Sequence, residues 1–396
     1  MTDAAHILFR GVVVLPEQVM QDGYVACSQG KIVAVGEGKT PAVYARFSSV
    51  TADIIAPGFI DIHVHGAANA DYMDGTLDAV KTVNRAHATH GTTAIFPTTT
   101  TGSFEELDAM VTSCETVKKN WTRSDGARIA GIHFYGPYFA EDKVGCHDAA
   151  GRRDPVKSEY EYFLSKDIIK IATCAAELVG ALDFYKFARD NDCYITCGHS
   201  NASWEELEAA FDVGVRHVDH FWCAMSSVVS LRKRFGMPMQ AGMEQFVLMN
   251  REMTTEVIAD GQHLTDPLLE FAARMIGSDR LCLVTDANRA MDCPPGEYRF
   301  GHRETGALVF SDGVKVTGED GGLASSMCGM DHMVRTMASG SKSTLNEVIA
   351  MASLTPAKLT GIDETHGSLA VGKTADINLL SGDLRLEGTY IAGQKI

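Results

Sequence analysis

Residues 59–65 read Phe59-Ile60-Asp61-Ile62-His63-Val64-His65. A short, mostly apolar run of this kind, flanked by amphipathic stretches, predicts a buried strand. Alternate residues on a strand point to the same side, so both imidazoles can reach one ion. This stretch therefore predicts a first strand that carries two histidines at its carboxyl end.

Similar short apolar runs alternate with amphipathic helical stretches along the middle of the chain, which favours repeated βα units and a parallel sheet. Ser103 with Glu106, and Ser203 with Glu206, have capping-box spacing at two helix starts. Eight such units predict an α/β fold, a (β/α)8 TIM-type barrel. The eight candidate strands are Phe59–Val64, Thr92–Pro97, Arg128–Phe134, Ile168–Ala175, Tyr194–Cys197, His217–Phe221, Thr255–Ala259 and Leu281–Thr285.

Both chain ends read as short strands broken by turn residues, namely His6–Leu15 and Gly23–Val35 at one end and residues 375–380 and 389–393 at the other. Neither end has enough strands to bury a sheet alone. We therefore expect the two ends to pair into one small β-sandwich domain formed by residues 1–55 and 365–396. Residues 56–364 would form the metallohydrolase barrel.

Composition excludes several classes of function. The formal net charge of −16 opposes binding to a phosphate backbone, so no nucleic-acid partner is expected. No apolar run reaches the roughly 20 residues of a membrane span, and the start of the chain lacks a secretory pattern, so we expect a cytoplasmic protein with no membrane partner. The ten cysteines form no CxxC pair and are expected to be buried, reduced thiols.

The polar residues that follow the predicted strands gather at one end of the barrel, where such folds place their chemistry. Besides His63 and His65, they are His199 after the fifth strand, His220 after the sixth and Asp286 after the eighth. Imidazoles with a carboxylate suit a divalent ion, zinc first, with iron, manganese or cobalt as alternatives. Asp286 can then move a proton to and from water, although an Asp here could also be a helix N-cap.

Several motifs resemble a known family. Residues 56–66 resemble the opening motif of the amidohydrolase superfamily, and residues 367–376 resemble its closing motif. Interior segments narrow the similarity, over nearly the whole chain, to the N-acetylglucosamine-6-phosphate deacetylase family. These segments are residues 91–93 and 97–98, 136–138, 145–148, 198–202, 259–263 and 283–287.

The resemblance implies hydrolysis of an N-acetyl amino-sugar phosphate, such as N-acetylglucosamine 6-phosphate, to acetate and a free amine. It implies that His199 and His220 are metal ligands and that Asp286 is the general base and acid. His147 and His263 would contact the sugar or the developing oxyanion. In the family a neighbouring subunit supplies an arginine for the phosphate, which implies a homodimer and points to the region of Arg232.

The sequence departs from the family after the third strand, where Tyr135 replaces a glutamate that is a metal ligand. A neutral phenol is a poor ligand, so the usual bridge between two metals is lost. We therefore predict one ion per chain, displaced toward His63 and His65, with His220 as a further ligand or an oxyanion donor. Glu177 is an alternative source of the missing carboxylate.

The substrate side departs as well. Cys223-Ala224 stand where the family has Asn-Ala, and the loop between Arg232 and Arg251 is rich in methionine and arginine. We expect Tyr135, Cys223 and Ala224 to contact the substrate. These changes leave room for a different N-acyl substrate, for a deaminase-type amidohydrolase with a mononuclear site, or for a barrel without catalytic activity.

Overall fold

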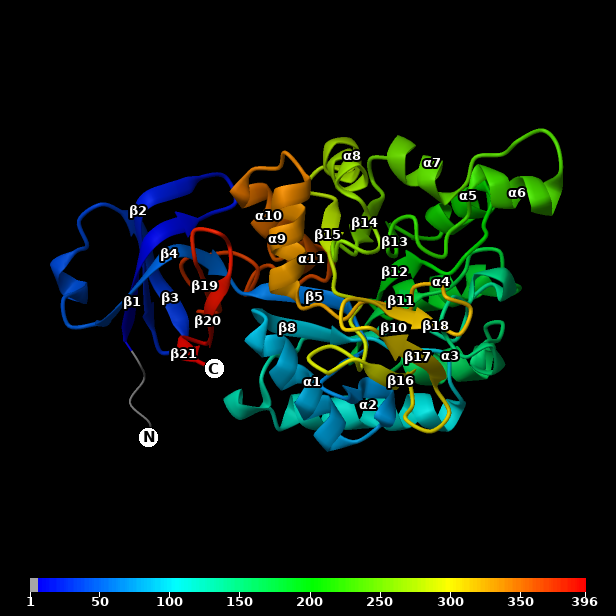
Figure 1. The fold of residues 1–396 in the computed structure, drawn as a ribbon, viewed down its shortest axis with the longest axis horizontal. Helices are drawn as coiled ribbons and strands as arrows, with labels where there is room; N and C mark the ends of the chain where they lie inside the picture. Colours follow the sequence, from blue (N-terminus) through cyan, green and yellow to red (C-terminus); the bar gives the residue numbers. More distant parts are fainter. Residues whose placement is uncertain (1–5) are drawn as a thin grey trace.

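The computed structural model describes residues 6–396, so the expected absence of a leader at residues 1–5 falls outside the described part of the chain. Its centre is a layer of parallel strands, visible in the middle and right of Figure 1. Three strands pair in one sheet: β5 (Phe59–Val64), β8 (Thr92–Pro97) and β9 (Arg128–Ile129). Six pair in a second: β10 (Ile132–Phe134), β11 (Ile169–Thr173), β12 (Tyr194–Cys197), β13 (His217–Val218), β14 (Thr254–Val257) and β15 (Leu281–Leu283).

The two parallel sheets are joined at both edges. A parallel bridge links Thr98 to His133, and the backbone N–H of Asp286 donates to the carbonyl of His63 over 2.9 Å. The strands therefore follow one another around a barrel, and the carboxyl ends of its first and last strands lie side by side. The α/β class and the parallel barrel predicted from the sequence agree with this arrangement.

Helices cover the outside of the parallel layer (Figure 1). The capping boxes predicted at Ser103 and Ser203 are both formed. Most of the buried apolar side chains form one large core between the strands and these helices. The helices are α1 (Leu77–Thr89), α2 (Phe104–Lys119), α3 (Lys157–Leu164), α4 (Ala181–Asp190), α5 (Trp204–Asp212), α6 (Val228–Phe235), α7 (Met243–Met249), α8 (Asp266–Ile276), α9 (Met330–Gly340), α10 (Leu345–Met351) and α11 (Leu354–Leu359).

Five of the eight predicted strands differ from the observed ones, and two of them, β11 and β14, differ only by one or two residues at each end. The segment 128–134 is split between β9 and β10, because Ala130 and Gly131 interrupt the ladder. The segment 217–221 keeps only two ladder residues before the chain turns at Asp219, and the segment 281–285 ends at Leu283. In the last two cases the chain leaves the ladder just before the polar residues of the site.

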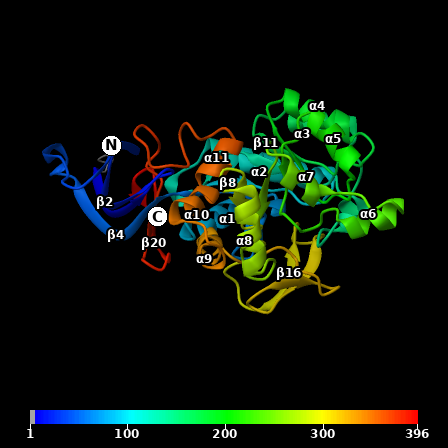
Figure 2. The same cartoon turned by 90° about the horizontal axis from the view of Figure 1, so that it is seen from above.

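An antiparallel sheet follows the barrel strands and was not predicted. It consists of β16 (Gly296–Phe300), β17 (Ala307–Ser311) and β18 (Val316–Gly318), and it projects from one side of the barrel (Figure 2). The short strands β6 (Gly66–Ala67) and β7 (Ala70–Asp71) form a small hairpin directly after β5. Both additions lie close to the carboxyl ends of the first and last barrel strands.

The two chain ends share one seven-stranded sheet, in which the blue and red strands of Figure 1 lie side by side. Its strands are β1 (Ile7–Val14), β2 (Val19–Ser28), β3 (Lys31–Glu37), β4 (Ser48–Pro57), β19 (Ile377–Leu380), β20 (Leu386–Ile391) and β21 (Gln394–Lys395). β4 pairs with β1 on one side and with β19 on the other. Because β4 runs almost directly into β5, this sheet is tied to the first strand of the barrel.

Two expectations from composition can be compared with residues 6–396. No helix in this range is long and apolar enough to cross a membrane. All ten cysteines are free thiols, six of them buried and four partly buried.

A partly exposed ion-pair cluster links three elements at the edge of the barrel. His90, which ends α1, contacts Asp331 of α9 through Nδ1 (2.8 Å) and Asp292 through Nε2 (3.1 Å). Burial disfavours the imidazolium, but hydrogen bonds to the two aspartates outweigh burial and raise the pKa of His90 to about 9. Arg335 also contacts Asp331, over 2.7 Å.

We expect this cluster to make stability depend on alkaline pH. A histidine with a raised pKa in the folded state contributes stability that is complete below its unfolded pKa of about 6.5 and is lost as pH rises through about 9. Urea unfolding at about pH 6 and about pH 10 should show a loss on the order of 2 kcal/mol that His90→Gln does not show. An identical pH dependence in the two proteins would contradict this role.

Candidate active site

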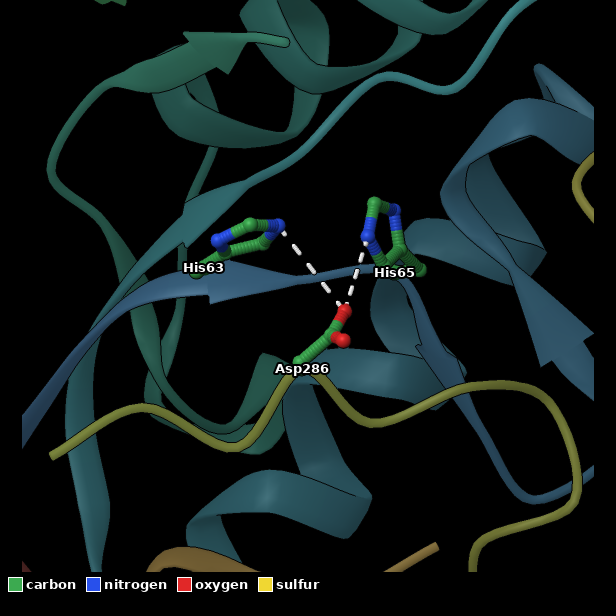
Figure 3. Close-up of side chains that lie close together, drawn as sticks. All are labelled: His63, His65 and Asp286. Carbon is green, nitrogen blue, oxygen red and sulfur yellow. Dashed lines mark ion pairs between the residues drawn. The ribbon is translucent and has the colours of Figure 1, made fainter. Parts of the chain in front are cut away.

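His63, His65 and Asp286 lie together at the carboxyl ends of β5 and β15 (Figure 3). Nε2 of His65 is 3.1 Å from Oδ1 of Asp286, and Nε2 of His63 is 3.8 Å from the same oxygen. All three side chains are buried, and neither Nε2 atom has a hydrogen-bond partner within the described chain. A buried polar atom without a partner is costly, so this arrangement calls for a group that binds all three atoms.

The hydrogen bonds of the site histidines determine which ring nitrogen carries the proton. Four of these imidazoles contact an acceptor oxygen through Nδ1, so in the neutral ring Nδ1 carries the proton and Nε2 presents a lone pair. Nε2 of His63 and Nε2 of His65 face the same carboxylate oxygen of Asp286. Burial alone would lower the pKa of His63, but Glu256 and Asp286 raise it to about 9, so a divalent cation bound here would displace the Nε2 proton of His63. The four pairs are His63 with Glu256, His65 with Thr98 O (3.2 Å), His199 with Lys143 O (2.5 Å) and His220 with Cys223 O (3.1 Å).

His199 and His220 lie beside this group. The ring of His220 stacks on that of His63 at a centroid distance of 5.3 Å, and His199 is 5.1 Å from His220. Burial lowers the pKa of His220 to about 4 and, together with the neighbouring imidazole, lowers the pKa of His199 well below its usual value. Both rings are therefore neutral near pH 7, as metal ligands must be.

Tyr135 occupies the position where the family motif has a glutamate. Its hydroxyl lies 2.5 Å from Nε2 of His220, and since that nitrogen is an acceptor, the hydroxyl donates. Burial is the main cause that raises the pKa of Tyr135 well above its usual value, so the phenol stays neutral. Its ring also packs against those of His63 (centroid distance 4.3 Å) and Phe139 (4.9 Å). Tyr135 thus fills the ligand position and covers the lone pair of His220.

A cavity of about 260 Å³ opens from these side chains. Other residues predicted from the sequence to meet the substrate line it: His147, Cys223, Ala224 and His263. Nδ1 of His263 contacts Asp260 over 2.9 Å, and although burial opposes it, this carboxylate raises the pKa of His263. The predicted sugar-contacting residues therefore share one cavity with His199, His220 and Asp286, while His63 and His65 lie next to Asp286 without lining that cavity.

Two residues that were considered from the sequence, one for the phosphate and one for the metal, lie away from the site in this chain. Arg232 is exposed on α6 and does not line the cavity. The carboxylate of Glu177 accepts hydrogen bonds from the Ser200 hydroxyl (2.5 Å) and the backbone N–H of Asn201, and it lies outside the group of His63, His65 and Asp286. The alternative that Glu177 replaces the missing ligand therefore has no support in the geometry.

Backbone strain is concentrated at the site. Several residues that line the cavity have positive φ angles, although they are not glycine, and such conformations persist only where the surroundings enforce them. They are His199 (44°), Ala224 (46°), Asp286 (44°) and Ser325 (57°). The strained backbone thus places these four residues in the lining of the cavity.

Three neighbours of the site were missed in the sequence. The hydroxyl of Ser325 donates to Oδ1 of Asp286 over 3.2 Å, and Phe300, from the unpredicted sheet, packs against His65 at a centroid distance of 4.9 Å. Nothing in the local sequence places either residue. Glu256 does carry a signal, because it is a charged residue inside the predicted strand Thr255–Ala259, and its carboxylate contacts Nδ1 of His63.

Comparison with known proteins identifies the family of the chain. The family model described as "Amidohydrolase family" matches residues 54–396. The N-acetylglucosamine-6-phosphate deacetylase of Vibrio furnissii is 31% identical over 395 residues, which cover 99% of this chain and 95% of the relative. The N-acetylgalactosamine-6-phosphate deacetylase of Escherichia coli O157:H7 is 29% identical, with 98% of each chain covered.

Solved structures give the same result for the fold. N-acetyl-D-glucosamine-6-phosphate deacetylase from Mycobacterium smegmatis superposes with a TM-score of 0.88 at 25% identity, covering 99% of this chain and all of the other. The enzyme from Pasteurella multocida has a TM-score of 0.88 at 24% identity, covering 99% of both chains. The chain is thus a hydrolase of the amidohydrolase family. Within that family it belongs to the N-acetylglucosamine-6-phosphate deacetylases, as the sequence motifs predicted.

Proposed function

We propose that the protein removes the acetyl group from an N-acetyl amino-sugar phosphate, such as N-acetylglucosamine 6-phosphate, with the help of one bound zinc ion. The observation that carries the proposal is the group of His63, His65 and Asp286, whose two Nε2 atoms are buried without a partner beside Asp286, a residue that lines the cavity. The identity of 31% to a deacetylase over nearly the whole chain supports the choice of substrate class.

His63, His65 and Asp286 would hold the ion. His199, whose ring centroid lies 5.1 Å from that of His220, is the candidate for a further ligand. A bound divalent cation of this kind polarises a carbonyl oxygen and lowers the pKa of water. His220 would join the set only if the Tyr135 hydroxyl turned away, because this hydroxyl occupies its Nε2. As a neutral ring protonated on Nδ1, His220 has no proton on Nε2 with which to bind an oxyanion, so we favour the ligand role over the donor role.

Asp286 is suited to carry the proton. Burial alone would raise its pKa, but the neighbouring imidazoles of His65, His63 and His220 hold the pKa of Asp286 well below its usual value. The ionised carboxylate can accept a proton from the attacking water and return it to the amine nitrogen as the C–N bond breaks. The Ser325 hydroxyl binds Oδ1, so Oδ2 is the oxygen that can face the reacting water.

His147 is the best placed neutral donor for the acyl oxygen. Its Nδ1 accepts a long hydrogen bond of 3.5 Å from the backbone N–H of Thr101, which leaves the proton on Nε2. Burial, followed by neighbouring imidazoles, lowers the pKa of His147 well below its usual value, so this ring donates one proton without carrying charge. His263, whose pKa is raised, would attract an anionic part of the substrate.

No arginine or lysine among residues 6–396 lines the cavity, so the phosphate requires a cation in addition to His263. Arg232 lies on exposed α6, and we propose that it reaches the phosphate in a second copy of the chain, as in a homodimer. The shared end sheet and its separate apolar cluster support a small domain of residues 1–55 and 365–396 beside a barrel of residues 56–364, whereas the β-sandwich form of that domain stays a prediction. A cytoplasmic location stays a prediction from the sequence.

The proposal is tested by measuring metal content and acetate release together. We expect about one zinc ion per chain and release of acetate from N-acetylglucosamine 6-phosphate or its galactosamine epimer, both abolished by a chelator and restored by zinc. The unphosphorylated sugars are the matched controls and should react poorly. Bound zinc without acetate from either phosphate would move the substrate elsewhere, and no binding of zinc would contradict the catalytic model.

A further inference from the structure

Glu256 lies beneath the candidate metal site and joins two of its histidines. It projects from β14, is fully buried, and its carboxylate receives three N–H groups. Oε1 accepts from Nδ1 of His63 and from the backbone N–H of His220 (3.1 Å), and Oε2 accepts from Nε2 of His217 (3.3 Å). A carboxylate with this number of donors is held in one position.

The contacts continue outward from Glu256 through polar side chains. Nδ1 of His217 lies 2.7 Å from the hydroxyl of Thr254, which lies 2.7 Å from the hydroxyl of Tyr194. The carbonyl of Arg216 accepts from Thr254 over 3.0 Å and ends the chain of hydrogen bonds. The position of Glu256 is thus determined by the frame of the barrel, independently of any ligand in the cavity.

We propose that Glu256 is a positioning residue for the metal site, which fixes the ring of His63 with the proton on Nδ1 and the lone pair of Nε2 toward Asp286. This inference rests on the proposed metal site. A carboxylate that accepts the second N–H of a ligating histidine orients the ring and makes it a stronger ligand. Glu256 also places a negative charge next to His63. This charge is relevant because Tyr135, which stands at the position of the family glutamate, is neutral and supplies no negative charge to the site.

The neighbouring carboxylate shows why this role falls to Glu256. Asp219 is equally buried, but its Oδ2 accepts from the hydroxyls of Thr173 (3.1 Å) and Thr196 (3.3 Å). No hydrogen bond within residues 6–396 connects Asp219 to an imidazole of the site. Asp219→Asn is therefore a matched control, since it also removes one buried negative charge from the same region.

The test is the affinity of the chelator-treated protein for Zn²⁺ alone, measured by competition with a chromogenic chelator. We expect Glu256→Gln to raise the dissociation constant by about 10- to 100-fold, while Asp219→Asn changes it by less than about threefold. The absorption spectrum of the Co²⁺-loaded protein should change in the first variant only. Equal affinities of wild type and Glu256→Gln, or an equal loss in both variants, would overturn the proposal.

A second measurement needs no variant at Glu256, in case Glu256→Gln does not fold. The ¹⁵N chemical shifts of His63 in zinc-loaded wild type should report a protonated Nδ1 and a metal-bound Nε2. The reverse assignment would overturn the inference. Zinc binding without acetate release would contradict the proposed function alone, whereas acetate release with unaltered zinc affinity in Glu256→Gln would contradict only the role of Glu256.

Discussion

Asp286→Asn is expected to lower kcat for acetate release by about 10²- to 10⁴-fold, the usual contribution of a positioned general base and acid. Asparagine has nearly the same shape as aspartate, and its amide oxygen can still face His65. It cannot accept the proton of the attacking water, and so has none to return to the amine nitrogen. Steady-state kinetics at about pH 7 measure the loss.

Asp286 is also a candidate metal ligand, so the loss of activity must be separated from a loss of metal. The assay is therefore repeated at increasing zinc concentration until bound metal reaches the wild-type level. We expect the rate to stay low in the metal-loaded variant. Full recovery of kcat would mean that Asp286 acts only as a ligand, and that another group carries the proton.

The parts of the fold that could be predicted are those dictated by local sequence. β5, β8 and β12 have the predicted bounds because each is a short, mostly apolar run with clear turn residues at its ends. Strand ends near the site were less predictable, since β13 and β15 leave the ladder to present His220 and Asp286. The sheet of β16–β18 was missed because its alternating residues lie in a stretch read only as the connection to the closing motif.

The sequence predicted the residues that could touch the ion, but not the residues that hold those side chains in place. His63, His65 and Asp286 were found because strand ends in a parallel barrel converge, whatever the details of packing. Contacts across the barrel depend on the register of distant strands, which local sequence does not encode. Glu256 contacts His63, which lies 193 residues away in the sequence, and Tyr135 contacts His220, which lies 85 residues away.

Tyr135 and Glu256 together suggest how one ion could suffice. The family glutamate would place a carboxylate among the imidazoles, whereas here a neutral phenol covers His220 and a carboxylate stands behind His63. A cation is stabilised most where lone pairs and negative charge converge, which favours the His63 and His65 side of the site. On this view Tyr135 determines how many ions bind.

Tyr135→Glu is accordingly expected to raise the zinc content from about one to about two ions per chain, because a carboxylate can bridge two cations in such sites. In the metal-free protein the new carboxylate is fully buried, and it cannot replace the hydrogen bond that the Tyr135 hydroxyl donates to His220. The free energy of unfolding should therefore fall by about 3–5 kcal/mol, and zinc should restore it. Elemental analysis and urea unfolding with and without zinc measure both effects.

Tyr135→Gln is the control for this prediction, since glutamine has the size of glutamate without its charge. We expect this control to keep about one ion per chain and to lose less stability in the metal-free form, because a neutral amide is less costly to bury than a charge. If Tyr135→Glu bound the same amount of zinc as Tyr135→Gln, the charge at this position would not set the number of ions. The second ion would then be excluded by the hydrogen bond of His220 to Cys223 or by the shape of the cavity.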